Sequence, residues 1–141
     1  MSNLVKLLYD VAALKAEYQR LHDDLFGLSM RRLWFLVRPG ARQSVEKRLQ
    51  DLLQRLAMRR AEMHQLNADD LSIRRGEEIR MALDDFCLAF TETLERLDKV
   101  HQRKTKIEVE PSDEPPLTAY DDALQQQRRL GARLNYLIES L

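Results

Sequence analysis

An unbroken heptad pattern of apolar residues opens the chain and limits its fold more than any other feature. The apolar side chains recur at alternating spacings of three and four residues, at Leu4, Leu7, Val11, Leu14, Tyr18, Leu21, Leu25 and Leu28. This spacing places all of them on one stripe of an α-helix, and the stripe must be buried against another helix to be stable. The opening segment therefore predicts a long helix that packs against further helices.

Two more segments carry seams of the same kind. The second expected helix, over about residues 42–66, has seam positions Val45, Leu49, Leu52, Leu56, Arg59, Met63 and Leu66. The third is expected to end near Gln102, with seam positions Ile79, Leu83, Phe86, Phe90, Leu97 and Val100. Residues 67–70, Asn-Ala-Asp-Asp, predict a break, because Asn can end one helix and Asp can cap the next.

The character of the chain changes after the third seam. Three prolines and an excess of acidic residues predict an extended linker over residues 105–119. We therefore divide the chain into a three-helix core over residues 1–104, this acidic, proline-containing linker, and a C-terminal helix over residues 120–141. The last helix is expected to pack on the bundle or on a partner.

The composition supports an all-α fold. Charged residues make up 33% of the 141 residues, and only 4 Gly and 4 Pro are present, which is too few for the many turns of a β-sandwich or barrel. We expect an antiparallel helical bundle of about four helices with coiled-coil-like heptad seams. The alternative is that the first helix pairs with a second copy of itself as a two-chain coiled coil.

The sequence also predicts a cytoplasmic protein. The first residues do not form a basic region followed by an apolar one, so no secretory signal is expected. The longest apolar run, Leu33–Val37, is far shorter than the roughly 20 residues of a membrane-spanning helix. A single cysteine, Cys87, excludes an internal disulfide framework and suits a reducing compartment.

That apolar run is the candidate protein interface. Five consecutive apolar residues cover every side of a helix, so the run must be enclosed on all sides or exposed to a partner. The interface candidates are Leu33, Trp34, Phe35 and Val37. Tryptophan next to arginine is typical of binding hot spots, and two adjacent aromatic rings can also stack on bases. The simpler alternative is a buried corner of the bundle.

Charge is distributed unevenly although the net charge is zero. Residues 31–60 contain nine basic and two acidic residues. The candidates for binding nucleic acid are Arg31, Arg32, Arg42, Arg48, Arg55 and Arg59. A row of guanidiniums could bind phosphates, since Arg makes bidentate contacts with them. The alternatives are ion pairs with the acidic third helix, and binding of an acidic protein or of the chain's own linker.

We identify no catalytic, metal-binding or cofactor-binding motif, and no small-molecule substrate is evident. None of the three histidines is followed by a possible ligand three or four residues later, and none is preceded by Glu at three residues, as metal sites in bundles require. Two spacings, Arg59 to His64 and Arg96 to His101, resemble the Arg-x4–6-His motif of HEPN-type ribonucleases. The residues after the two arginines, Arg60 and Leu97, depart from the polar uncharged residue usual in that motif.

The sequence thus predicts a non-enzymatic helical-bundle subunit or adaptor that binds a protein partner or a second copy of itself within a larger assembly. Burial of apolar helix faces would supply the affinity, and charged flanks would select the partner. The first alternative is a small helical subunit that contacts DNA or RNA through the basic stripe of the second helix. The second alternative is a HEPN-like ribonuclease.

Overall fold

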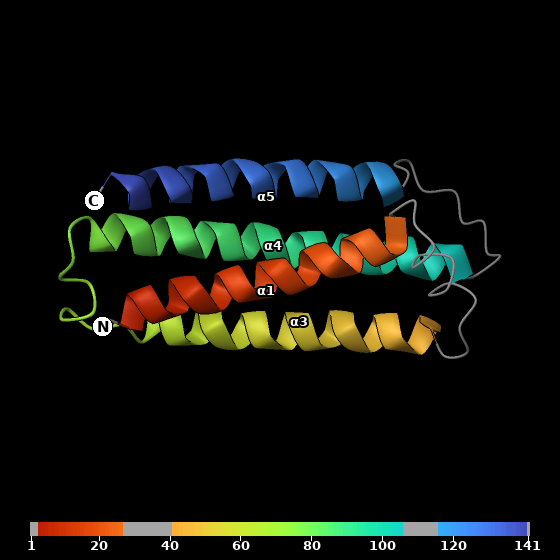
Figure 1. Ribbon diagram of the computed structural model, residues 1–141, viewed down its shortest axis with the longest axis horizontal. Helices are drawn as coiled ribbons and strands as arrows, with labels where there is room; N and C mark the ends of the chain where they lie inside the picture. The colour runs from red at the N-terminus through yellow and green to blue at the C-terminus, as the bar shows by residue number, and fades with distance from the viewer. Residues whose placement is uncertain (1–2, 27–40, 106–115, 141) are drawn as a thin grey trace.

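The chain folds as an antiparallel four-helix bundle. The computed structural model describes residues 3–26, 41–105 and 116–140. Its elements are α1 (Asn3–Phe26), α3 (Ala41–His64), α4 (Gly76–Thr105) and α5 (Pro116–Glu139), and these stretches contain no β-strand. Each helix runs opposite to the preceding one (Figure 1). The predicted fold class is therefore confirmed.

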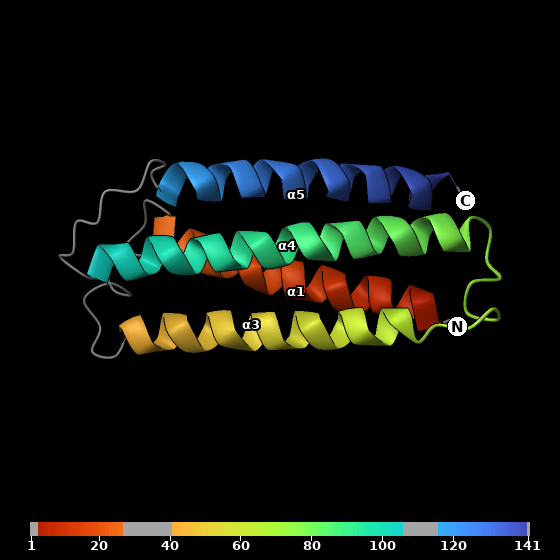
Figure 2. The ribbon, with the colours of Figure 1, turned by 180° about the vertical axis from the view of Figure 1, so that it is seen from behind.

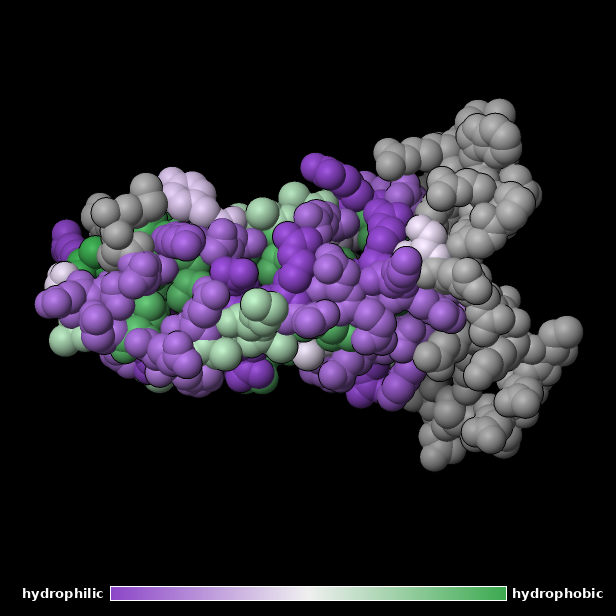
Figure 3. Space-filling view, turned by 90° about the horizontal axis from the view of Figure 1, so that it is seen from below, coloured by the Kyte–Doolittle hydropathy of each residue, from purple (hydrophilic) through white to green (hydrophobic). Residues whose placement is uncertain are grey.

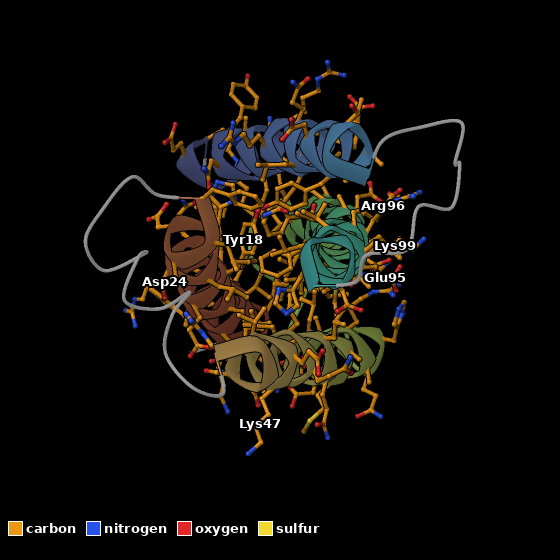
Figure 4. All side chains as sticks on the ribbon, turned by 90° about the vertical axis from the view of Figure 1, so that its right-hand side faces the viewer. Tyr18, Asp24, Lys47, Glu95, Arg96 and Lys99 are labelled. Carbon is orange, nitrogen blue, oxygen red and sulfur yellow. The ribbon has the colours of Figure 1, made fainter. Side chains whose placement is uncertain are left out.

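The helix α1 crosses the bundle at an angle. Seen end on, the helices follow one another around the bundle in the order α1, α3, α4, α5 (Figure 4). Figures 1 and 2 show that α1 begins beside α3 and approaches α5 towards its C-terminal end. Consequently the described contacts between α1 and α5 come from the last turns of α1, while α5 packs along α4.

The predicted seams form the core. From α1 and α3 the buried apolar residues are Leu4, Leu7, Val11, Leu14, Tyr18, Leu21, Leu25, Val45, Leu49, Leu52, Leu56 and Met63. From α4 and α5 they include Ile79, Leu83, Phe86, Phe90, Leu94, Leu97, Val100, Tyr120, Leu124, Leu134 and Leu137. Leu66 is only partly buried, and Leu28 lies outside the described residues. Among the described helices, none has a stretch long and apolar enough to cross a bilayer.

The helix boundaries differ from the predicted ones mainly around the linker. The helix α5 begins at Pro116, so residues 116–119, which we assigned to the linker, are helical. Proline is favoured at the first helical position because its missing N–H would have no partner there anyway. The other end of the predicted linker also shortens, because α4 extends to Thr105.

The connection between α3 and α4 is fixed by its own side chains. Asn67 and Asp70 bond to each other reciprocally, each side chain accepting a hydrogen bond from the other's backbone N–H at 2.9 and 3.2 Å. Asp70 does not cap α4; its carboxylate instead accepts a bond from the Asn3 N–H at the start of α1 (3.3 Å). Arg75 ends this connection with a positive φ of 58°. A Cβ at position 76 would overlap the Leu71 carbonyl, so glycine is required at that position.

Small residues bring α4 and α5 close together. Ala82, Ala89 and Ala123 are buried on these helices. A Cβ built on Gly131 of α5 would lie 3.2 Å from the Phe86 ring of α4, which is tighter than an ordinary van der Waals contact. The two backbones can therefore approach more closely than larger side chains would permit.

Candidate functional site

The predicted protein interface lies outside the part of the chain that the structure describes. Its residues are Leu33, Trp34, Phe35 and Val37, and the neighbouring Arg31 and Arg32 also fall outside the described residues. Arg42 belongs to α3, but its side chain is not among those described. The structure therefore bears on the basic stripe only through Arg48, Arg55 and Arg59.

The three described arginines of the stripe face α1. Each guanidinium forms an ion pair with a carboxylate of α1 through its Nη1 atom. The pairs are Arg48–Asp24 at 3.0 Å, Arg55–Glu17 at 2.6 Å and Arg59–Asp10 at 3.2 Å. Lys47, one residue before the first of them, points away from the bundle (Figure 4). The stripe is thus the polar flank of the α1–α3 seam.

The alternative that paired this stripe with the acidic third helix was wrong about the partner helix. The third helix is α4, yet the carboxylates come from α1. At about 100° per residue the stripe lies on one flank of the α3 seam, whereas Arg60 lies on the other. Arg60 accordingly bonds to Asp84 of α4 (3.2 Å).

Ion pairing reduces what this stripe can offer to phosphates. Arg55 donates to Glu17 and to Asp51 one turn away, and these hydrogen bonds raise the pKa of its guanidinium further. Arg59 also pairs with Glu62 of its own helix (2.9 Å). A phosphate would have to displace carboxylates already in place, which costs part of any binding energy.

The two Arg–His spacings place their members on different sides of the helices. Arg59 faces α1, whereas His64 Nε2 lies 3.7 Å from Asp84 Oδ1 of α4. Arg96 pairs with Glu92 on the solvent side of α4 at 3.7 Å, whereas His101 is buried. Five residues correspond to about 140° on a helix, so the members of each pair point in different directions.

A buried hydrogen-bonded cluster, which we did not predict, joins α1 to α5. The Tyr18 and Tyr120 hydroxyls are hydrogen-bonded to each other, and His22 Nδ1 lies 2.6 Å from the Tyr120 hydroxyl. The His22 and Phe26 rings stack on Tyr120 with centroids 5.8 Å away. Tyr18 also packs edge-to-face on Phe90 of α4 (5.5 Å). Three helices therefore meet at this cluster.

The electrostatics of the cluster favour neutral groups. Burial raises the pKa of both Tyr18 and Tyr120, so the phenols keep their protons. Burial lowers the pKa of His22, although Asp23 partly opposes this. One arrangement gives each of these two contacts a donor and an acceptor: Tyr18 donates to Tyr120, and Tyr120 donates to an unprotonated His22 Nδ1.

One signal in the sequence could have revealed this cluster. Tyr18 occupies a seam position where the other residues are aliphatic, and a buried tyrosine hydroxyl requires a hydrogen-bond partner. The partner, Tyr120, lies 102 residues away in the chain. The pairing itself therefore depended on the helix order in space, which the sequence pattern did not provide.

Cys87 and the possible metal ligands are the remaining chemistry-bearing side chains in the described part of the chain. Cys87 is fully buried, and this burial raises the pKa of its thiol to about 12, so it is a poor nucleophile. Over the described stretches, no three His, Cys, Asp or Glu side chains are grouped so as to hold a metal ion.

Several large apolar side chains are instead exposed to solvent. They are Tyr9 of α1, Met58 of α3, Met81 and Leu88 of α4, and Tyr136 of α5. Seen from the α3 side, the surface is mostly hydrophilic with smaller apolar areas between the charged side chains (Figure 3).

Comparisons with known proteins assign no family to the chain. No protein-family model, curated protein or solved structure matches it. What the protein does must therefore be inferred from its own residues.

Proposed function

We propose that the chain is a non-enzymatic subunit or adaptor that binds a protein partner, or a second copy of itself, within a larger assembly. The observation that supports this proposal is an apolar stripe, formed by Met81 and Leu88, on the outer side of α4. Their side chains are 57% and 47% exposed. When a partner covers large apolar side chains that were exposed to water, the free energy of the complex is lowered.

The geometry of the stripe suits a partner helix. Met81 and Leu88 are seven residues apart, so they lie about 20° from each other around α4 and about 10 Å apart along it. Figure 4 shows that Glu95, one heptad beyond Leu88, and Lys99 point away from the bundle on this side. A partner would therefore meet an apolar centre with charged residues at its edge, as protein interfaces commonly have.

The two other candidate functions have less support. Binding of DNA or RNA through the basic stripe of α3 would require Arg48, Arg55 and Arg59 to leave carboxylates of α1. The HEPN-like ribonuclease would require His64 to act with Arg59, yet the two face different helices. A cytoplasmic location belongs to the same proposal, and the buried, unpaired Cys87 is consistent with it.

Site-directed crosslinking tests the proposal. A photoreactive residue replaces Asp85, which is exposed between Met81 and Leu88, and the cells that produce the protein are irradiated. We expect a discrete protein adduct that is lost when Met81→Glu and Leu88→Glu are introduced. Met58→Glu, which changes an equally exposed methionine on α3, should leave the adduct unchanged.

The mass of the adduct and its loss in the glutamate variants decide whether the proposal holds. An adduct of twice the chain mass indicates self-association, and any other discrete mass indicates a different partner. The proposal is wrong if no adduct forms, or if the adduct survives both glutamates. Circular dichroism checks that each variant remains helical.

A further inference from the structure

The described arginines of α5 differ from those of α3 and α4. Within the described residues, carboxylates lie within ion-pair distance of Arg48, Arg55, Arg59 and Arg60 of α3 and of Arg80 and Arg96 of α4. By contrast, Arg128, Arg129 and Arg133 of α5 form no ion pair with any described residue, and all three are exposed. Their positive charge is therefore directed to solvent.

The surrounding sequence keeps this charge unneutralised. Residues 123–138 contain these three arginines and no Asp or Glu. Acidic residues occur only towards the ends of α5, at Asp121, Asp122 and Glu139. A net charge of zero for the whole chain thus conceals a positive segment in the middle of its last helix.

An exposed aromatic ring lies on the same side of the helix. Arg129, Arg133 and Tyr136 are spaced four and three residues apart, so they fall within about 60° of one another around α5. Tyr136 is 68% exposed. Arg128 lies towards α1, where its charge influences the Tyr18–Tyr120–His22 cluster. We call Arg129, Arg133 and Tyr136 the basic face of α5.

The chemistry of this face matches a single strand of nucleic acid. Arginine binds phosphate oxygens through two parallel N–H bonds, and it does so best when no carboxylate competes. An exposed aromatic ring offers a flat surface on which an unpaired base can stack. A double helix would use the arginines but not the ring, because its bases are already stacked on one another.

We propose that the basic face of α5 binds single-stranded nucleic acid by phosphate contacts to Arg129 and Arg133 and base stacking on Tyr136. Phosphate contacts and ring stacking do not depend on which base is present, so binding tolerates different sequences. Affinity is modest, since few phosphates are contacted. This inference is independent of the protein-binding stripe on α4, which lies on another helix.

Fluorescence anisotropy with a labelled oligothymidylate at low salt tests the proposal. We expect Arg129→Gln with Arg133→Gln to weaken binding about tenfold or more. The slope of log affinity against log salt should become shallower by about 1.4, because each phosphate of a single strand that an arginine neutralises adds about 0.7 to that slope. Tyr136→Ala should weaken binding about tenfold and leave the slope unchanged.

Matched controls separate a specific site from general attraction. Lys6→Gln with Lys47→Gln removes the same charge from exposed positions on α1 and α3, and should change binding little. The proposal is overturned if the wild-type chain does not bind, or if this control weakens binding equally. It is also overturned if Tyr136→Ala has no effect while polyglutamate competes as well as the oligonucleotide, because the face would then bind an acidic protein segment.

Discussion

The α1–α3 pair and the α4–α5 pair are both antiparallel, yet different interactions hold them together. Ion pairs line one flank of the α1–α3 seam, where three arginines meet three carboxylates. Between α4 and α5 no ion pair occurs among the described side chains, and close packing around Gly131 takes its place. Charge therefore helps to set the register of the first pair, whereas shape sets that of the second.

The two pairs tolerate different kinds of change. An ion pair that is partly exposed contributes little and can be rearranged by its flexible side chains. A backbone approach that requires glycine cannot be rearranged without moving a helix. We therefore expect α4–α5 to be sensitive to volume and α1–α3 to be sensitive to charge.

The largest effect is expected from Gly131→Leu. The new side chain would collide with the Phe86 ring, so we expect a loss of about 2–3 kcal/mol in the free energy of unfolding, despite a gain in helix propensity of about 1 kcal/mol. Urea denaturation measures this change in the free energy of unfolding. Ala132→Leu, one residue later and exposed, should cost less than about 0.5 kcal/mol. Equal effects would show that α4–α5 packing is not close at Gly131.

The next largest effect is expected where the two pairs meet. Tyr120→Phe removes a hydroxyl that bonds to Tyr18 and His22, leaving two polar groups without this partner. We expect a loss of about 1–2 kcal/mol in the same measurement. Tyr136→Phe removes an exposed hydroxyl and should be nearly neutral. If both variants are neutral, the cluster does not join α1 to α5.

Charge reversal tests the α1–α3 pair. Arg59→Asp places a carboxylate beside Asp10 and Glu62, and we expect a loss of about 1 kcal/mol because the site is partly exposed. Adding Asp10→Arg should recover most of this loss, and high salt should reduce the difference. Arg129→Asp on α5, where no described carboxylate lies within ion-pair distance, should change stability little. A double variant no more stable than Arg59→Asp alone would contradict the pairing.

A smaller, pH-dependent effect is expected from His22. Burial lowers its pKa in the folded chain, so below about 6.5 the unfolded chain binds the proton more readily. The stability that His22 contributes is therefore present above about pH 6.5 and lost as the pH falls through the folded pKa. As the pH is lowered through this range, the denaturation midpoint should fall more for the wild type than for His22→Gln. Parallel curves would show that His22 does not titrate with folding.

The sequence predicted most of the fold because each helix carries a regular seam. The apolar positions of α1 and α3 alternate so regularly that almost all of those described are buried. The start of α5 was placed after Pro116 because the three prolines and the acidic residues predicted an extended linker, whereas proline is also a good first residue of a helix.

Much less of the candidate site was predictable. The polar partners of Arg48 and Arg55 depended on which helix lies on each side of α3, and periodicity alone gives no such order. Similarly, the exposure of Met81 and Leu88 follows from α4 having a side that no other described helix covers. The predicted interface at Leu33, Trp34, Phe35 and Val37 remains a prediction.

The hairpin between α3 and α4 has a mechanical consequence. Asp70 accepts a hydrogen bond from Asn3, and Arg75 donates one to Ser140. The start of α1 and the end of α5 are therefore both bonded to the same short connection. Figure 1 shows the two chain ends at this end of the bundle. A force that pulls them apart would break these two bonds first and then peel α1 and α5 away turn by turn. Such unzipping resists tension poorly, because only a few contacts bear the load at any moment.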